Sequence, residues 1–367
     1  MASRVFPLFL LALAAARAAA GQTPAAAAGP PFDTAARTPH RITLSIDTEP
    51  ARDILTLLSG SDGAPAALRR LKASAPARVA LKAEGTNPDD FFGRLVTAAT
   101  GTPDALLASY RAEAPLLQAV LDVTEHDASG AASLLAARVA SLLPEDPAVT
   151  ARLLVVPFVG SGGFREITTV RDEEGLFFVV DLPRLLGQAG GRLQPREAFL
   201  RMLRETGSDA SRILFSTSFR KAPAWPPVGG ADFGALLARS VAEGPPALFL
   251  IPDEFFPLDP FFAEPVQRAF VRWNQAADRL LDLKEKDLAR RQILEEASHG
   301  DFWAQYPAVV GAQMADLLLR QKGRAAYLAA LAAGPRAVAL LYAETVRGTK
   351  RPDFSKTVRK ALEEKKP

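Results

Sequence analysis

Three hydroxylated residues interrupt an apolar helical stretch in RILFSTSFRKAPAWPP, residues 212–227. Ser216, Thr217 and Ser218 stand where an amphipathic helix would continue its apolar stripe. Ser218 and Lys221 have the Ser-x-x-Lys spacing of serine hydrolases related to penicillin-binding proteins, but the companion Ser-Asp-Asn and Lys-Thr-Gly signatures are absent. The spacing therefore does not indicate such a hydrolase. A structural interpretation is that at least two of the three hydroxyls bond to carbonyls one helical turn back.

The three histidines of the chain are His40, His126 and His299. Glu296 and His299 have the Glu-x-x-His spacing of a di-metal carboxylate site, but that chemistry needs the motif twice. We therefore interpret His299 as a residue of a last helical turn, where the helix dipole favours a cation. His126 is expected in a loop and His40 at the end of a linker, so the histidines do not indicate a metal site.

The segments around the hydroxylated stretch carry a family resemblance. Short strands precede it, and a loop and a helix containing LARSVAEG, residues 237–244, follow it. A later helical stretch contains Gly311, Met314 and Ala315. This arrangement resembles the gluzincin zinc metallopeptidases, and most of all a group of bacterial proteins classed as predicted zinc-dependent peptidases, over residues 152–344.

The resemblance implies a zinc site that this chain lacks. In the family, His-Glu-x-x-His supplies two zinc ligands one helical turn apart and a general base beside the metal-bound water, and a later helix supplies a third ligand, Glu. By the resemblance, Ser216, Thr217 and Arg220 occupy the first-ligand, base and second-ligand positions, while Glu243 keeps the third. Hydroxyls are poor zinc ligands and arginine does not deprotonate. We therefore expect no catalytic residue, bound metal or cofactor, and an ion pair between Arg220 and Glu243 instead.

Hydrophobic periodicity predicts an α+β fold that is mostly α-helical. A strand at 42–46 precedes helical signals from 48 to about 143, among them a helix that Asn87 caps and Gly101 ends, and a second start at Thr102. β-branched and aromatic residues then predict a small antiparallel sheet. Its strands are expected at 153–159, 164–170 and 176–181. The loop at 160–163 is rich in glycine, but a strand follows it, so it does not predict a phosphate site.

The remaining sequence is again helical. Two helices are expected at 195–207 and 208–220, the second capped by Ser208, and a third runs from Asp232 to a stop at Gly244. A long amphipathic helix begins near residue 265. Gly311 and Met314 share one helical stripe, for which close helix contact is the expected reason.

The N-terminus predicts export. Residues 1–20 combine a basic start, an apolar stretch and a run of alanines, which is typical of a signal peptide cleaved after Ala20. Removing Arg4 and Arg17 lowers the formal charge from +3 to +1, so nothing favours nucleic acid as a partner, and no stable membrane span is expected after cleavage. The chain has no cysteine, so it contains no disulfide.

Five segments are therefore predicted, which are a signal peptide (1–20), a flexible linker (21–40), a helical N-terminal region (41–150), a degenerate gluzincin-like metallopeptidase region (151–349) and a basic C-terminal tail (350–367). The leading functional hypothesis is an exported, periplasmic or extracellular, non-catalytic relative of zinc metallopeptidases that binds a peptide or protein through the inherited cleft. An active peptidase or hydrolase with an unrecognised or rebuilt site is the alternative, and a purely structural domain is a third. An open cleft beside Glu243 would favour the first over the third.

Overall fold

The computed structural model describes residues 42–144, 151–160, 166–172, 175–187, 193–219, 224–226, 230–250 and 260–364. The predicted signal peptide, its cleavage site, the linker and His40 lie outside these residues. The elements in chain order are β1 (Ile42–Ile46), α2 (Glu49–Ser59), α3 (Ala64–Ala73), α4 (Ala75–Ala83), α5 (Pro88–Thr100), α6 (Ala105–Ser141), β2 (Ala151–Phe158), β3 (Ile167–Asp172), β4 (Gly175–Asp181), α7 (Leu182–Gly187), α8 (Pro195–Ser218), α9 (Phe233–Leu250), α10 (Pro260–Leu281), α11 (Asp287–Glu296), α12 (Tyr306–Gln321), α13 (Gly323–Ala332), α14 (Pro335–Val346) and α15 (Lys356–Glu363). The expected α+β, mostly helical fold is confirmed.

The four described strands form one mixed sheet in the order β1-β2-β4-β3. β1 pairs with β2 and β2 pairs with β4 in parallel, and only β3 and β4 are antiparallel. The prediction of an antiparallel sheet is therefore wrong for most of its pairs. The reason is the connectivity. The segment α2 to α6 forms the crossover between β1 and β2 that a parallel pair requires. β3, at the edge of the sheet, runs antiparallel to β4.

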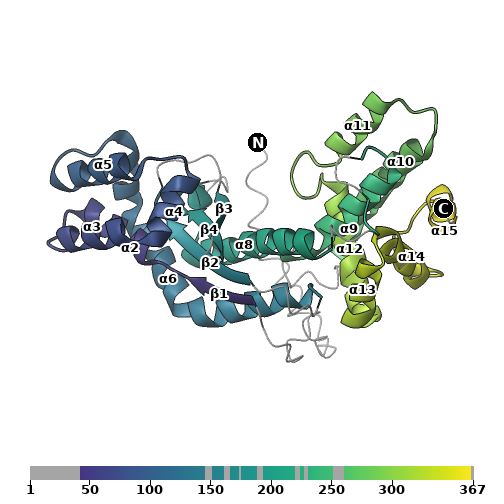
Figure 1. Ribbon diagram of the computed structural model, residues 1–367, viewed down its shortest axis with the longest axis horizontal. Helices are drawn as coiled ribbons and strands as arrows, with labels where there is room; N and C mark the ends of the chain where they lie inside the picture. Colours follow the sequence, from purple (N-terminus) through teal and green to yellow (C-terminus); the bar gives the residue numbers. More distant parts are fainter. Residues whose placement is uncertain are drawn as a thin grey trace, which may run out of the picture.

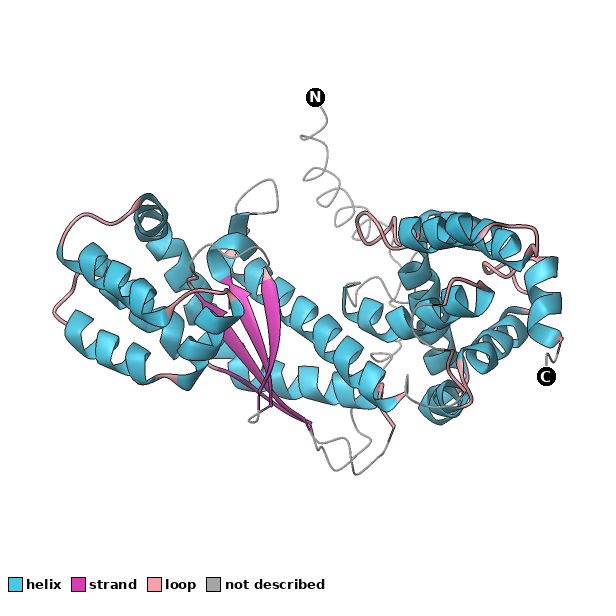
Figure 2. Cartoon of the chain, turned by 45° about the horizontal axis from the view of Figure 1, so that its top comes forward, coloured by secondary structure: helices cyan, strands magenta, loops and turns pink. Residues whose placement is uncertain are grey.

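The molecule has two lobes that share one helix. Figure 1 shows the sheet with α2 to α6 in the first lobe and α9 to α15 in the second, with α8 running from one to the other. Figure 2 shows the sheet between α2 to α5 on one side and α6 with α8 on the other. Residues of the first half of α8, such as Phe199 and Met202, belong to one hydrophobic cluster, while Leu214 and Phe215 belong to a second. α8 therefore contributes to both clusters, and so does α6, whose Leu121 belongs to the first cluster and Val139 to the second.

α8 is one continuous helix of 24 residues, so the expected break between residues 207 and 208 and the cap at Ser208 are wrong. Gly207 lies inside it because neighbouring side chains approach its Cα closely. A Cβ at this position would lie 2.4 Å from Phe249 Cδ1 and 2.7 Å from Leu135 Cδ1. Close packing against α6 and α9 therefore explains why a glycine occupies this position inside the helix. From the sequence alone, the same glycine suggests a helix end.

α9 also continues past its predicted end. The expected stop at Gly244 is wrong, because the helix runs on through Pro245 and Pro246 to Leu250. Gly244 instead meets Gly311 of α12: a Cβ on Gly311 would lie 1.9 Å from the Ser240 carbonyl oxygen and 2.9 Å from Gly244 Cα. The expectation that Gly311 serves close helix contact is thus confirmed.

Smaller sequence signals had mixed outcomes. The cap at Asn87 is confirmed, because its Oδ1 accepts a bond of 2.9 Å from the Asp89 amide, and α5 ends at Gly101. The next helix begins later than expected from Thr102, since Asp104 caps α6 by accepting from the Leu107 amide. The basic C-terminal segment contains α15, whose Val358 is buried against the second lobe.

Candidate functional site

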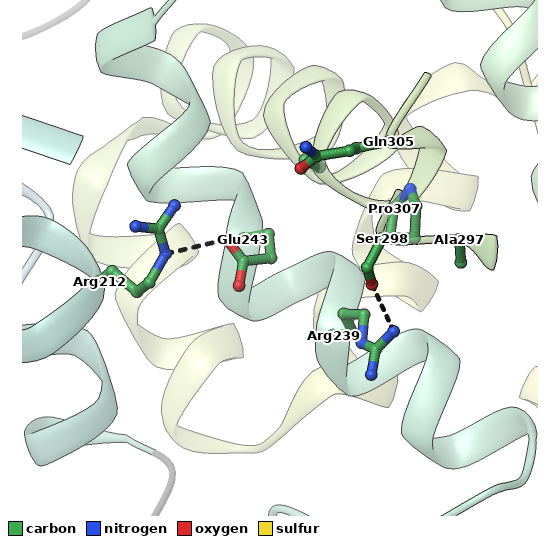
Figure 3. A pocket seen from close by; sticks show the side chains of 8 residues that line it. Arg212, Arg239, Glu243, Ala297, Ser298, Gln305 and Pro307 are labelled. Carbon is green, nitrogen blue, oxygen red and sulfur yellow. Dashed lines mark hydrogen bonds and ion pairs between the residues drawn. The ribbon is translucent and has the colours of Figure 1, made fainter. Parts of the chain in front are cut away.

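An open pocket of about 380 Å³ lies in the second lobe, where α8, α9, the end of α11 and the start of α12 meet. Its lining is formed by Arg212, Arg239, Glu243, Ala297, Ser298, Gln305, Pro307 and Ala308. Five of these residues are polar, and the three apolar ones belong to the end of α11 and the start of α12. Figure 3 shows the Glu243 side chain between Arg212 on one side and Arg239 with Ser298 on the other. Ligand-binding pockets have concave volumes of a few hundred Å³ and a few placed polar groups. This pocket shares both features, with a lining that is more polar than that of most such sites.

Glu243 lies in the pocket wall and its carboxylate has a partner. Arg212 on α8 donates from Nε to Glu243 Oε2 over 3.2 Å, and from Nη1 to Asp209 Oδ1 over 2.6 Å. The Glu243 side chain is 33% exposed and that of Arg212 43%. The pair is therefore within reach of solvent and of a ligand.

Helix packing fixes the position of Glu243. Asp232 begins α9 as expected, because its Oδ1 accepts a bond of 2.8 Å from the Ala235 amide. α9 then packs closely against α12 where Gly244 meets Gly311. The pocket lies beside the first turn of α12. On the buried side of the same turn, Trp273 donates from its indole Nε1 to Ser240 Oγ over 2.7 Å. Glu243 thus projects from a well-packed helix.

Arg239 lines the pocket on the side of α11. It lies four residues before Glu243, so the two side chains share a face of α9. Its Nη1 donates to the Leu294 carbonyl oxygen and to Ser298 Oγ, at the end of α11. Sequence reasoning missed Arg239 and Arg212, although the i, i+4 spacing of Arg239 and Glu243 is a signal that could have pointed to the first.

Ser216 and Thr217, two of the three degenerate motif positions, lie near the end of α8 and outside the pocket lining. Thr217 is exposed and its Oγ1 bonds to the Ile213 carbonyl over 3.0 Å, while Ser218 Oγ is buried without a hydrogen-bond partner. Among the described contacts, Ser216 makes no such bond either, so the expectation that two of the three hydroxyls bond back is wrong. Arg220 and Lys221 lie outside the described residues, and with them the expected Arg220–Glu243 pair.

The histidines that the structure describes are both exposed. His126 lies inside α6, so its expected place in a loop is wrong; α6 continues through that region to Ser141. His299 follows α11 by three residues, and its Nδ1 lies 2.5 Å from the Glu295 carbonyl oxygen, so it does stand at a helix end. Over the described ranges, no group of three or more His, Cys, Asp or Glu side chains could hold a metal ion.

A buried carboxyl group lies at the end of β4, in the first lobe. Asp181 is 3% exposed, and burial raises its pKa to about 7, while the Arg184 amide, which donates to Oδ1 over 3.2 Å, acts in the opposite direction. Glu84 and Glu166 lie near enough to raise this pKa further. Asp181 directly precedes α7 and accepts from the Arg184 amide in that helix, so its position has a structural explanation.

Comparisons of the chain with protein-family models, with curated proteins and with solved structures return no match. Among the helices of the described residues, none has the length and apolar character needed to cross a bilayer.

Proposed function

We propose that this chain is an exported, non-catalytic relative of zinc metallopeptidases that binds a peptide or protein in the pocket beside Glu243. One observation carries the proposal: the glutamate at the third-ligand position of the resemblance lies in the wall of an open pocket and pairs with Arg212. An arginine supplies the positive charge that zinc supplies in the family.

The residue types support a binding role over a catalytic one. Ser216 and Thr217 carry hydroxyls where the family has a ligand and a general base, and a neutral hydroxyl replaces neither. Neither side chain lines the pocket. The side chains that do line it can donate and accept hydrogen bonds, and they offer both signs of charge, which suits a peptide with its amides and terminal charges.

The pocket predicts which variant weakens binding. We expect the full-length chain, immobilised, to retain a fraction of a pool of short randomised peptides that can be read by mass spectrometry. Ser298→Trp places a large side chain at an exposed position of the pocket wall and should reduce retention by about tenfold, a loss of about 1.4 kcal/mol. Ser109→Trp, at an exposed serine of α6, should leave it unchanged.

Two results would count against the proposal. One is retention by the unmodified chain that does not exceed that of bare support. The other is equal retention by the Ser298→Trp variant, which would place any peptide binding outside this pocket.

A further inference from the structure

Arg239 is held in place by neutral acceptors. The Leu294 carbonyl oxygen and Ser298 Oγ both accept from its Nη1. Within the described residues no carboxylate lies within ion-pair distance of this guanidinium, whereas Arg212 on α8 contacts both Asp209 and Glu243. Arg239 thus brings a fixed and unbalanced positive charge to the pocket.

The free edge of Arg239 has the geometry of a carboxylate receptor. Its Nε and Nη2 have no acceptor in the described part of the chain, and these two groups present parallel N–H bonds that fit both oxygens of a carboxylate. The same edge is used elsewhere in the molecule: Arg52 donates from Nε and Nη2 to the two oxygens of Glu125, each over 2.8 Å.

Glu243 does not fill this edge. It is four residues from Arg239 on α9, close enough for an i, i+4 pair, yet its carboxylate turns toward Arg212 on α8, as Figure 3 shows. The side chains of Arg239 and Glu243 therefore face the pocket with opposite charges and without neutralising each other.

The start of α12 adds positive potential on the same side. Pro307 and Ala308, in the first turn of this 16-residue helix, line the pocket. The N-terminal end of a helix carries a partial positive charge that attracts anions. Gln305, just before the helix, donates from its amide nitrogen to the Gly300 carbonyl, so its Oε1 remains available to a ligand N–H.

We infer that the pocket recognises a carboxylate group of its ligand through the Nε–Nη2 edge of Arg239. This inference rests on the proposed peptide binding and specifies it: the carboxylate is either the free C-terminus of a peptide or an acidic side chain. Ser298 acts as a positioning residue, since it holds Nη1 and leaves the other edge of the guanidinium open.

Three randomised peptide pools, each passed over the immobilised full-length chain, distinguish the two sources of the carboxylate. The pools are free-acid peptides, C-terminal amides without acidic residues, and C-terminal amides with one fixed glutamate. We expect about tenfold weaker retention of the acid-free amides. Retention of the glutamate-containing amides at the level of the free acids identifies a side-chain carboxylate; retention at the level of the acid-free amides identifies the C-terminus.

Two variants test whether the preference for carboxylate-containing peptides depends on Arg239. Arg239→Gln should abolish the difference between pools, while Arg268→Gln, at an exposed arginine of α10, should retain it. Equal retention of acids and acid-free amides by the unmodified chain overturns the carboxylate inference and leaves peptide binding intact. This comparison does not depend on the folding of any variant.

Succinate distinguishes the inference from the proposed function. At constant ionic strength, it should raise the unfolding temperature of the unmodified chain and not that of Arg239→Gln. Such a rise, with no peptide retained from any pool, would support the carboxylate site and contradict peptide binding. No rise and no retention would overturn both.

Discussion

The Nε of Arg212 lies 3.2 Å from Oε2 of Glu243, and both side chains remain accessible from the pocket. An ion pair at this level of exposure contributes up to about 1 kcal/mol to stability. We therefore expect Arg212→Ala to lower the free energy of unfolding by less than about 1 kcal/mol, measured by urea denaturation.

A buried pair in the same lobe provides the contrast. Arg320 Nε lies 2.6 Å from Asp316 Oδ1, and burial raises the pKa of Asp316 while the arginine opposes that rise. Arg320→Ala should cost about 3 kcal/mol, because it leaves a buried carboxyl group without this partner. Similar costs for the two arginine variants would contradict the accessible placement of the Arg212–Glu243 pair.

The crossing of α9 and α12 predicts a large effect of one methyl group. Gly311→Ala would place a Cβ 1.9 Å from the Ser240 carbonyl oxygen, so the helices must move apart. We expect a loss of about 3 kcal/mol in the free energy of unfolding. Gly93→Ala is the matched control, because Gly93 is a helical glycine at which an added Cβ would meet no atom within 4 Å; it should be neutral or stabilising by up to about 1 kcal/mol. Equal effects would argue against the close crossing.

The buried Trp273–Ser240 hydrogen bond gives a further prediction. Both residues are fully buried, so Ser240→Ala leaves the indole N–H without its acceptor. The expected cost is about 1–3 kcal/mol, measured by thermal unfolding with tryptophan fluorescence. Ser109→Ala, at an exposed position of α6, should change little.

Asp181 predicts a pH dependence of stability. Its pKa is raised from the ordinary 3.8 to about 7 in the folded chain, so the folded state holds this proton over a range where the unfolded state has lost it. The contribution is fully present below about pH 4 and is lost as the pH rises to about 7. The stability of the chain minus that of Asp181→Asn should fall over this window. A flat difference would place Asp181 in a more polar environment than its burial indicates.

Local signals in the sequence predict most of the helices, because caps such as Asn87 and Asp232 act within a few residues. The errors lie where tertiary packing decides. Glycine often ends a helix, so Gly207 and Gly244 suggest helix ends in the sequence. In the structure each lies inside a helix, because a side chain or helix distant in sequence packs closely against it. The parallel pairing of β2 with β4 likewise depends on strand order, which alternation of apolar residues does not encode.

The candidate site is only partly predictable for the same reason. The family resemblance singles out Glu243, which does lie in the pocket wall. Its partner Arg212 is on another helix, and Ser298 and Gln305 follow α11 in a connecting segment, so their convergence depends on how α8, α9 and α12 pack. Arg212 directly precedes the apolar run that leads into the hydroxylated stretch, but its contact with Glu243 exists only because α8 lies against α9.

The most direct test of the proposed non-catalytic role measures binding and cleavage in one sample. A peptide retained by the pocket is synthesised with a fluorophore and a quencher at its ends and titrated with the full-length chain, with and without added zinc. We expect a saturable rise in anisotropy, which needs about tenfold more protein in the Ser298→Trp variant, and no gain in fluorescence intensity. A gain in intensity that requires the chain and disappears in Glu243→Gln would contradict this role, because that result would make the pocket a catalytic site.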